Sequence, residues 1–402
     1  MENYKIGEAP RVTTFGRRKV TPRVCVADRK PHIRTFIAEV LEELGFVTSE
    51  CMHSGQLAAV LDEHLPDILV LGLSCGGIEA RDMLNQLAAK EFAGKVLLLG
   101  PEESSAVVAV QELGETLGIA MLPTLITPFG VDHLRDRLVS FLPIDAPPHM
   151  PVDAAEAISA GWLELWYQPK INTRTLALRE AEGLIRIRHP TWGIVPPAYF
   201  IGDDRDPSFR GMSEFVIGRA IDDWRYFVTQ HAPIGIAINL PLAFLQDSAC
   251  VESLCLQVPD HPAFEGLIVE ISGAEVVHNL ELVKDVAKQL RYHNIAISID
   301  NLGTDWPSLV GHDHFPFVEI KVDRKFVAGC SHDRLKRAMC RQILDMAEGY
   351  GARTVAEGVE TRQDFIAVCE MGFDLVQGFL FAKPMTARKF ARTMLGRPVA
   401  IP

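Results

Sequence analysis

The sequence predicts an α/β protein in which a doubly wound parallel sheet is followed by a (β/α)8 barrel. Short apolar, β-rich runs alternate with segments of helical periodicity along the chain. The Pro-rich stretch Leu142–Pro151 divides these units into two series, and a length of 402 residues also favours two domains. We therefore expect a tail at 1–20, a first domain at 21–143, a linker at 144–151 and a second domain at 152–402.

The first series begins with a predicted strand at Arg23–Ala27 and a helix at Pro31–Leu44 that stops at Gly45. Because its strand candidates are apolar throughout, we expect them to be buried on both faces, as in a parallel sheet between two helical layers. The other expected strands are Ile68–Leu73 and Lys95–Leu99. The other expected helices are Gly55–Glu63, Ala80–Lys90, Ser104–Leu117 and Gly130–Phe141.

The second series places a polar residue at or beside the end of each expected strand. These strands are Leu176–Glu182, Ile234–Asn239, Leu267–Glu270, Ile295–Asp300, Val318–Lys321, Thr354–Glu357 and Leu375–Gln377. Helices such as Leu280–His293 and Leu335–Gly349 alternate with them. In (β/α)8 barrels the carboxyl ends of the strands carry the functional side chains. The series therefore predicts one polar site, built from every strand of the barrel.

Several of these strand-end residues are carboxylates, which would repel one another in a buried site unless cations lay between them. Taken singly, each residue has a plainer interpretation: a glutamate as a salt-bridge partner, Asn239 as a turn former, Lys321 as a surface lysine. Their order and number together favour a metal site.

Composition excludes several classes of protein. The net charge is −12 and the basic cluster Arg17-Arg18-Lys19 is short and isolated, which disfavours a nucleic-acid partner. A phosphate-bearing small ligand fits if metal ions neutralise it. The eight cysteines form no CxxC pair, as is typical of a reducing compartment. No apolar run reaches the ~18 residues of a membrane helix. We expect a cytoplasmic protein without a membrane partner.

Four motifs of the second domain resemble those of EAL domains, over about residues 152–395. They are Glu182-Gly183-Leu184-Ile185-Arg186, Lys321-Val322-Asp323-Arg324, Ala356-Glu357-Gly358-Val359-Glu360, and Gln377-Gly378 followed by Lys383-Pro384. The resemblance implies a bacterial protein that hydrolyses cyclic di-GMP to pGpG with two Mg²⁺ or Mn²⁺ ions. Such hard cations bind oxygen ligands and together activate water and neutralise phosphate charge.

The resemblance also implies a role for each residue. The first metal would be held by Glu182, Asn239, Glu270 and Asp300, and the second by Asp300, residue 301 and Glu357. Lys321 would hydrogen-bond the attacking water, with Glu357 and Gln377 completing the catalytic group. Arg186 would contact the ligand phosphate and Pro384 would lie beside the ligand. Trp306 stands where the family usually has tyrosine, and it either faces the ligand or packs in the core.

The second domain departs from the family pattern at the metal site. Asn301 replaces the second aspartate of a pair, and Gly273 replaces a glutamate thought to anchor the loop that carries this pair. We therefore expect one ion rather than two, and cyclic di-GMP binding with hydrolysis weak or lost. Two alternatives stay open: an active phosphodiesterase that tolerates Asn301, and an interaction protein that no longer binds the nucleotide. Other departures are Gly183, Leu240-Pro241, Gly202–Pro207, Leu302, Asp305 and Pro307.

The first domain resembles a response-regulator receiver domain, on Asp28, Pro66-Asp67 and Pro128-Phe129. The positions that carry receiver chemistry differ, since the acidic pair reads Asp28-Arg29 and the phosphoacceptor position reads Gly72. Glycine has no side chain to phosphorylate. We therefore expect a degenerate receiver that dimerises or docks a partner protein. Arg29 is expected to pair with Asp28, or else to be solvated.

Overall fold

The computed structural model describes residues 22–64, 66–73, 77–102, 104–138, 141, 152–190, 192–201, 208–230, 233–304, 306–311 and 316–395. The expected tail at 1–20, the linker at 144–151, the Gly202–Pro207 segment and Asp305 lie outside these residues. The chain splits into two compact units, residues 1–150 with 188–195 and residues 151–187 with 196–402.

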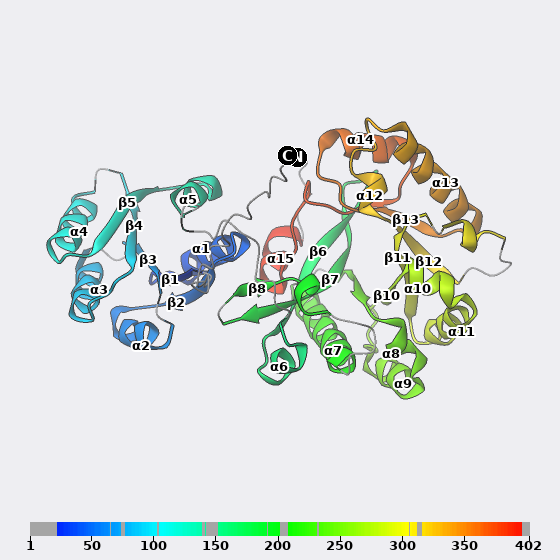
Figure 1. Ribbon diagram of the computed structural model, residues 1–402, viewed down its shortest axis with the longest axis horizontal. Coiled ribbons are helices and arrows are strands. Elements are labelled where there is room, and N and C mark those ends of the chain that lie inside the picture. The colour runs from blue at the N-terminus through cyan, green and yellow to red at the C-terminus, as the bar shows by residue number, and fades with distance from the viewer. Residues whose placement is uncertain are drawn as a thin grey trace, which may run out of the picture. The chain divides into compact units, whose positions relative to one another are not determined.

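The first unit holds a five-stranded, fully parallel sheet in the order β2-β1-β3-β4-β5 (Figure 1). This order is that of flavodoxin-like doubly wound sheets, which confirms the predicted fold of this domain. Its strands are β1 (Arg23–Ala27), β2 (Val47–Cys51), β3 (Ile68–Gly72), β4 (Lys95–Pro101) and β5 (Ala120–Thr127). Its helices are α1 (Pro31–Glu43), α2 (Ser54–His64), α3 (Gly77–Ala89), α4 (Ser105–Thr116) and α5 (Val131–Leu138).

Two separate hydrophobic clusters lie in this unit, and successive residues of β1 alternate between them. Cys25 and Ala27 belong to one cluster, and Val24 and Val26 to the other, so both faces of the sheet are buried. The strands β2 and β5 were not predicted, because their residues are mostly half-buried or exposed and lack an apolar run.

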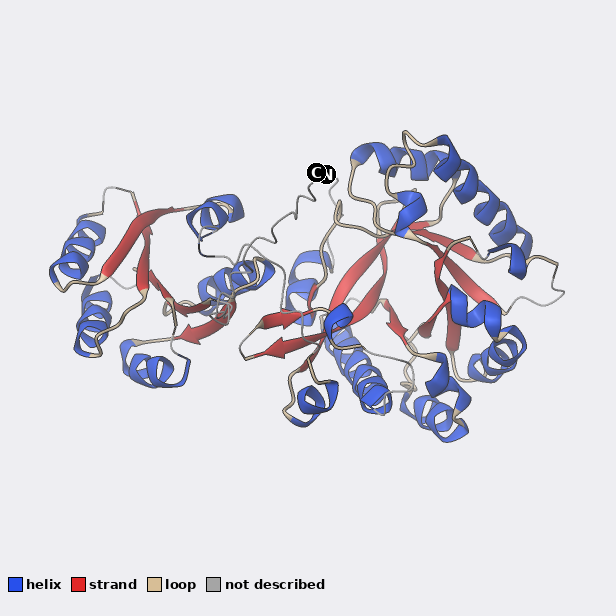
Figure 2. Ribbon diagram, in the orientation of Figure 1, coloured by secondary structure: helices blue, strands red, loops and turns tan. Residues whose placement is uncertain are grey.

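The second unit is a closed barrel of eight strands, with helices around it (Figure 2). The barrel strands are β6 (Leu163–Asn172), β7 (Leu178–His189), β9 (Gly235–Asn239), β10 (Leu267–Ser272), β11 (Ile295–Leu302), β12 (Phe317–Val322), β13 (Arg353–Ala356) and β14 (Leu375–Val376). The short strand β15 (Met385–Thr386) extends the sheet beside β6. The end of β7 and the short strand β8 (Gly193–Val195), which pairs with β7, fall in the segment 188–195 that is grouped with the first unit. The barrel confirms the predicted fold, with one difference: β6 runs antiparallel to both β7 and β14.

The helices of this unit follow the strands along the chain. They are α6 (Ala154–Ser159), α7 (Ser208–Thr229), α8 (Leu242–Gln246), α9 (Ser248–Gln257), α10 (Gly273–His278), α11 (Leu280–Arg291), α12 (Arg324–Val327), α13 (Arg334–Tyr350), α14 (Arg362–Met371) and α15 (Ala387–Met394). Two 3₁₀ turns, η2 (Pro197–Tyr199) and η3 (Trp306–Leu309), lie in the connections. Among the described residues, no helix is long and apolar enough to cross a membrane.

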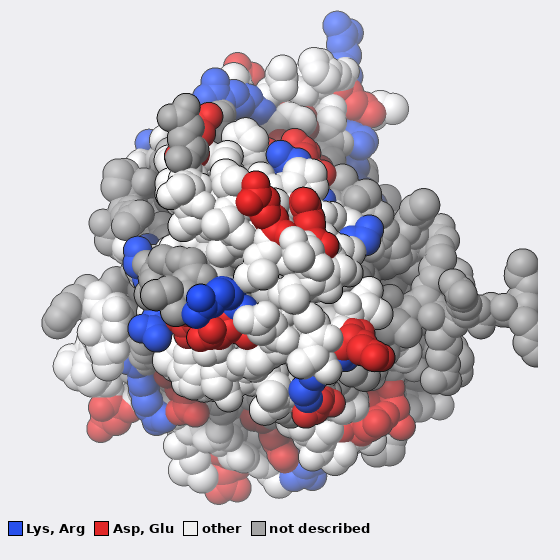
Figure 3. Space-filling model, turned by 90° about the vertical axis from the view of Figure 1, so that its left-hand side faces the viewer, with Lys and Arg blue, Asp and Glu red and all other residues white. Residues whose placement is uncertain are grey.

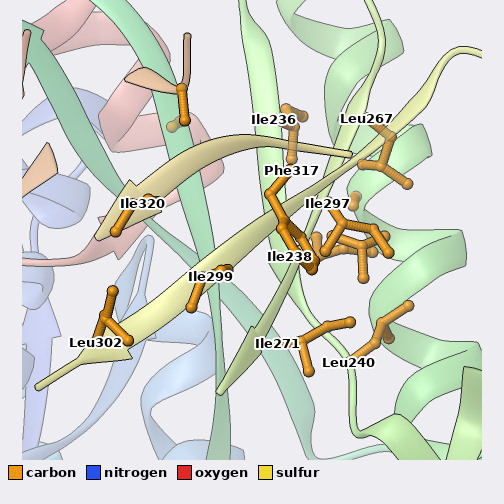
Figure 4. Packing of buried hydrophobic residues seen from close by; sticks show 14 of the residues in the cluster. Ile236, Ile238, Leu240, Leu267, Ile271, Ile297, Ile299, Leu302, Phe317 and Ile320 are labelled. Carbon is orange, nitrogen blue, oxygen red and sulfur yellow. The ribbon is translucent and has the colours of Figure 1, made fainter. Parts of the chain in front are cut away.

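Branched apolar side chains of β9, β10, β11 and β12 pack together in the main core of this unit (Figure 4). Residues such as Ile238, Ile271 and Ile299 are at most 1% exposed. Because side chains alternate along a strand, the residues between them point into the barrel. In register, Glu270 lies beside Asn239 and Ser272 beside Asp300, which brings the ends of three strands to one rim.

The surface carries charges of both signs. On the face shown in Figure 3, basic and acidic side chains are interspersed with uncharged residues. The net charge of the whole sequence is −12.

Candidate functional site

Lys321, at the end of β12, is the centre of the site, and its side chain is only 1% exposed. Its Nζ lies 3.1 Å from Glu182 Oε2, 2.8 Å from Glu270 Oε2, 2.8 Å from Asp300 Oδ1 and 2.9 Å from Glu357 Oε1. Four carboxylates thus converge on one ammonium group: Glu182 lies within β7, Glu270 and Asp300 lie near the ends of β10 and β11, and Glu357 follows β13. The sequence placed these five residues in one site, and the structure brings them together.

Two neutral residues orient Glu182. Asn239 Nδ2 donates to Glu182 Oε1 at 2.8 Å, and Gln377 Nε2 donates to Glu182 Oε2 at 2.6 Å. Gln377 Nε2 also donates to Gln168 Oε1 at 3.1 Å. Both oxygens of Glu182 are therefore fixed by amides in addition to Lys321. Asn239 and Gln377 lie where the sequence placed them.

Asn301 follows Asp300 at the end of β11 and adopts a left-handed backbone conformation, with φ of 51°. Asparagine accepts this conformation more readily than most residues. Its Nδ2 donates to Asp300 Oδ2 at 2.6 Å. The side chain thus turns back on its neighbour and supplies a hydrogen-bond donor to the carboxylate.

A second layer of charge, which the sequence did not reveal, is buried beneath this site. Lys170 on β6 is fully buried, and its Nζ lies 2.7 Å from Glu270 Oε1, 2.6 Å from Glu319 Oε1 and 3.8 Å from Glu180 Oε2. Arg353 closes a ring by pairing with Glu180 at 2.7 Å and Glu319 at 3.1 Å. We call Lys170, Glu180, Glu319 and Arg353 the charge ring. Two cations and two anions leave it formally neutral.

The upper layer is not balanced, because four carboxylates face the single ammonium of Lys321. Burial, and after it Asp300, raises the pKa of Glu357 well above its usual value. Burial and then the Glu182 carboxylate raise the pKa of Glu270 in the same way. Burial alone would lower the pKa of Lys321. The surrounding carboxylates, Asp300 and Glu182 first, raise it by more than burial lowers it, so the pKa lies well above its usual value and the lysine is charged. Four ionised carboxylates and one ammonium would give a formal charge of −3, and the raised pKa values of Glu357 and Glu270 mean that bound protons relieve part of this excess.

A cleft of about 470 Å³ opens above these residues. Its lining includes Glu182, Asn239, Asp300, Asn301, Glu357 and Gln377 from the predicted site. Arg186, Trp306 and Pro384, the expected ligand contacts, are not among the described residues that line it. The Arg186 guanidinium donates to its neighbour's carbonyl, Ile185 O, at 2.8 Å, and Trp306 packs against the core, as the plainer interpretation had it.

The cleft also has lining residues that the sequence reasoning did not assign to the site. Arg324 and Glu360 form an ion pair of 2.8 Å at the rim, and Phe379 is 49% exposed there. Arg324 packs across Gly358, where a Cβ atom would lie 2.2 Å from Arg324 Cγ. Arg324 and Glu360 lie within sequence motifs that resemble those of EAL domains, and Phe379 directly follows one. This resemblance is the feature of the sequence that could have identified them as site residues.

The loop after β11 packs directly on Gly273, the first residue of α10. A Cβ atom at position 273 would lie 3.2 Å from Leu302 Cδ1 and 3.4 Å from Asp300 O. A side chain at this position would therefore contact the backbone that carries Asp300 and Asn301. In this chain Glu275 is the nearest acidic residue of α10, and it accepts from Ser272 Oγ at 2.6 Å and Leu242 N at 3.0 Å instead.

In the first unit, Asp28 occupies the space beside Gly72. A Cβ atom on Gly72 would lie 1.9 Å from Asp28 Oδ2, while Asp28 Oδ1 accepts from Lys30 N at 2.7 Å. Arg29 does form an ion pair, but with Glu79 at 2.6 Å rather than with Asp28. The expectation for the partner of Arg29 was wrong, because Glu79 on α3 is within reach of the guanidinium.

The residues around Lys321 fit a hard divalent cation by their chemistry. They offer carboxylate and amide oxygens, which Mg²⁺ and Mn²⁺ prefer, and a net negative charge that a cation would relieve. Asp300 Oδ1 is buried, and its partner is the ammonium group of Lys321, 2.8 Å away. Within the described part of the chain, however, no three acidic, His or Cys side chains are arranged to hold an ion as they stand. The oxygens converge on the ammonium group of Lys321 instead.

The fold and the site define a barrel domain with an oxygen-rich, acidic centre at the carboxyl ends of its strands. The EAL domain model matches residues 152–384, more than half of the chain. The chain therefore belongs to the EAL domain family, which confirms the resemblance seen in the sequence.

Two relatives and one solved structure illustrate the likeness. Cyclic di-GMP phosphodiesterase NbdA of Pseudomonas aeruginosa is 28% identical over 59% of this chain and 30% of its own length. Cyclic di-GMP phosphodiesterase RocR of the same organism is 24% identical over 81% of this chain and 86% of its own length. The PaMucR phosphodiesterase in complex with c-di-GMP is 27% identical, with a TM-score of 0.53 over 59% of this chain and 97% of that one. The chain spans less than a third of NbdA but most of RocR.

Proposed function

We propose that this protein binds cyclic di-GMP in the cleft above Lys321 and hydrolyses it weakly or not at all. Membership of the EAL domain family supports the ligand. So do relatives named as cyclic di-GMP phosphodiesterases and a similar structure in complex with c-di-GMP. A cleft of about 470 Å³ lies within the range of ligand sites in proteins.

The observation that carries the loss of hydrolysis is the 2.6 Å hydrogen bond from Asn301 Nδ2 to Asp300 Oδ2. Two adjacent carboxylates would repel each other and so favour a cation between them. An asparagine that donates to its neighbour relieves this repulsion without an ion. The demand for a second divalent cation is therefore weaker here, while the ligands of a first cation are all present.

The first ion would be held by Glu182, Asn239, Glu270 and Asp300, and Glu357 and Asn301 would remain for a second, weaker position. Bound Mg²⁺ or Mn²⁺ supplies neutralisation of phosphate charge and a water of lowered pKa. The chain's own contribution is to fix the oxygens, through Asn239 and Gln377 on Glu182 and Lys170 on Glu270. Lys321 is the cation that would orient the attacking water. Arg186, the expected phosphate contact, does not line the cleft, whereas Arg324 does.

An active metal-dependent phosphodiesterase is the second candidate. The observation in its favour is that four carboxylates and Lys321 converge within 3.1 Å, so most of the catalytic group is assembled. In this alternative the amide oxygen of Asn301 would serve as the ligand that the aspartate normally provides. The two proposals share the ligand and differ in turnover.

One experiment separates these functions. Purified protein is incubated with cyclic di-GMP and Mn²⁺ or Mg²⁺, pGpG is followed by chromatography, and binding is followed by calorimetry in the same buffer. We expect binding at micromolar ligand and slow pGpG formation. Rapid turnover would establish the phosphodiesterase, and absence of binding would contradict both candidates.

For the first unit we propose a receiver-like module that is not phosphorylated and serves for dimerisation or docking of a partner protein in the bacterial cytoplasm. Gly72 offers no carboxylate, and Asp28 lies over it. Intact-mass spectrometry after incubation with acetyl phosphate and Mg²⁺ should show no phosphoryl adduct. Analytical ultracentrifugation of the full chain should show a dimer, or a monomer if the module docks another protein.

A further inference from the structure

Tyr350, the last residue of α13, holds the far end of the loop that follows β11. Its hydroxyl donates to Leu309 O at 2.8 Å and accepts from Gly311 N at 2.9 Å. We propose that Tyr350 is a positioning residue for the cyclic di-GMP site, on which it acts by fixing this loop from α13. The proposal rests on the proposed function, because it assigns the loop a part in binding that ligand.

The loop begins at the site itself. Asp300 and Asn301 line the cleft, and the chain then continues from Leu302 to the 3₁₀ turn η3, which ends at Leu309. Both leucines are fully buried and belong to the main core of the second unit. Only a short stretch of chain therefore separates the cleft residues from the backbone groups that Tyr350 binds.

A neighbouring helix, α10, offers the loop no side chain at the position that faces it. η3 lies against α10, whose first residue is Gly273. A Cβ atom at position 273 would lie 3.2 Å from Leu302 Cδ1 and 3.4 Å from Asp300 O, so this position faces the start of the loop. The start of the loop is therefore left without a side chain from position 273, and its far end is held by Tyr350.

The contacts of the Tyr350 hydroxyl differ from simple packing because they fix backbone groups. Gly311 has a left-handed backbone conformation, with φ of 86°, which suits a turn. A hydroxyl that donates to one carbonyl and accepts from an N–H two residues later holds a single arrangement of this turn. Without the hydroxyl both groups would bond to water, and the turn would open more often.

Tyr350→Phe removes the hydroxyl and keeps the aromatic ring. By hydrogen–deuterium exchange with mass spectrometry, we expect amides of residues 306–311 to exchange about tenfold faster in this variant, because both hydrogen bonds are lost. By calorimetry at saturating Mn²⁺, we expect cyclic di-GMP to bind about fivefold more weakly, within the range for residues that act through intervening structure. Tyr292→Phe, at a tyrosine that is 90% exposed, is the matched control and should change neither.

A rescue variant separates positioning from general stability. Gly273→Glu/Tyr350→Phe places a side chain of α10 against the loop, and it should recover part of the ligand affinity that Tyr350→Phe loses. A loss of affinity caused by a destabilised α13 would not be recovered by a residue on α10.

Two results would overturn the proposal. Unchanged exchange in Tyr350→Phe would mean that the hydroxyl does not hold the loop. Faster exchange with unchanged ligand affinity would mean that the loop has no part in the site. If the wild-type protein itself does not bind cyclic di-GMP, the proposed function fails as well, and this outcome is recognised without any variant.

Discussion

Asn301 Nδ2 lies 2.6 Å from Asp300 Oδ2, so adjacent residues at the end of β11 are joined by a hydrogen bond between their side chains. The amide gives the Asp300 carboxylate a neutral partner where an aspartate would add a second negative charge. It also occupies one oxygen that a cation would use. A single amide substitution therefore changes both the charge of the site and the availability of Asp300.

Asn301→Asp should not by itself restore full hydrolysis. The new carboxylate would recover the charge that a second ion requires, but Gly273 still leaves the loop without a side chain to hold it. Misplacement by about an ångström can cost roughly 100-fold in rate. We expect pGpG formation to rise in Asn301→Asp and to rise further in Asn301→Asp/Gly273→Glu, measured by chromatography at saturating Mn²⁺.

The Gly273→Glu single variant is the control for this pair. A Cβ atom there would lie 3.2 Å from Leu302 Cδ1, so the leucine side chain must shift by a few tenths of an ångström. Thermal unfolding should show that the variant folds. Equal turnover of the Asn301→Asp single and double variants would mean that charge was the only defect.

Gly72→Ala should destabilise the first unit by about 1–3 kcal/mol, which is typical of overpacking. The added Cβ atom would lie 1.9 Å from Asp28 Oδ2, and moving Asp28 breaks its hydrogen bond with Lys30 N. Gly130→Ala is a matched control in the same unit, since the nearest atom to its Cβ is 3.8 Å away. Circular dichroism with chemical denaturation compares the two variants, and equal stability would argue against close packing of Asp28 on Gly72.

Divalent ions should stabilise the protein more at pH 8 than at pH 6. Burial and then Glu182 raise the pKa of Glu270 from 4.5 to about 8. Glu270 therefore keeps its proton in the folded state at pH values where the unfolded chain has lost it. Its contribution to the free energy of unfolding is fully present below pH 4.5 and declines as the pH rises towards 8. Mn²⁺ must displace the proton at pH 6 but not above pH 8.

The pH dependence of stabilisation by divalent ions is checked by thermal unfolding with and without Mn²⁺ at pH 6 and at pH 8. In Glu270→Gln the position no longer titrates, so the difference between pH 6 and pH 8 should become smaller. A Mn²⁺-induced shift of the same size at both pH values in the wild-type protein would contradict the expectation.

Asp364→Ala should destabilise the second unit by about 1–3 kcal/mol, because four hydrogen bonds to one buried carboxylate are lost together. The carboxylate accepts from Thr361 Oγ1 at 2.9 Å, from Gly329 N at 3.1 Å, and from both N and Oγ of Ser331 at 3.1 and 2.7 Å. Burial raises its pKa, but the Ser331 hydrogen bonds lower it more, so this contribution is lost only as pH falls below about 3.8. Asp345→Ala, an exposed aspartate on α13, should have little effect in the same denaturation experiment.

Most strand ends of the barrel lie within two residues of the expected ones, because a polar residue interrupts an apolar run near the rim. The expected strand Ile234–Asn239 is observed as Gly235–Asn239, for example. The exception is β7, which was expected to end at Glu182 but continues to His189, where it pairs with β6 as far as Ile187. The strand β6 was not predicted, because Gln168 and Lys170 make it look exposed. The partners of Lys170 lie 100 and 149 residues further along the chain, at Glu270 and Glu319, so local sequence carries no sign of the charge ring. Closure of the barrel brings these residues together.

Lys170→Met should destabilise the second unit by about 3–5 kcal/mol, because it leaves Glu319 and Glu270 with one cation fewer in a buried position. Lys170→Met/Glu319→Gln removes a cation and an anion together, and it should recover part of this loss. Four of the five tryptophans, Trp162, Trp166, Trp224 and Trp306, lie in the second unit, so tryptophan fluorescence during urea unfolding of the full chain reports mainly on this unit. If the double variant is no more stable than Lys170→Met, the loss of stability comes from packing of the lysine side chain. The balance of charge in the charge ring is then not what stabilises the barrel.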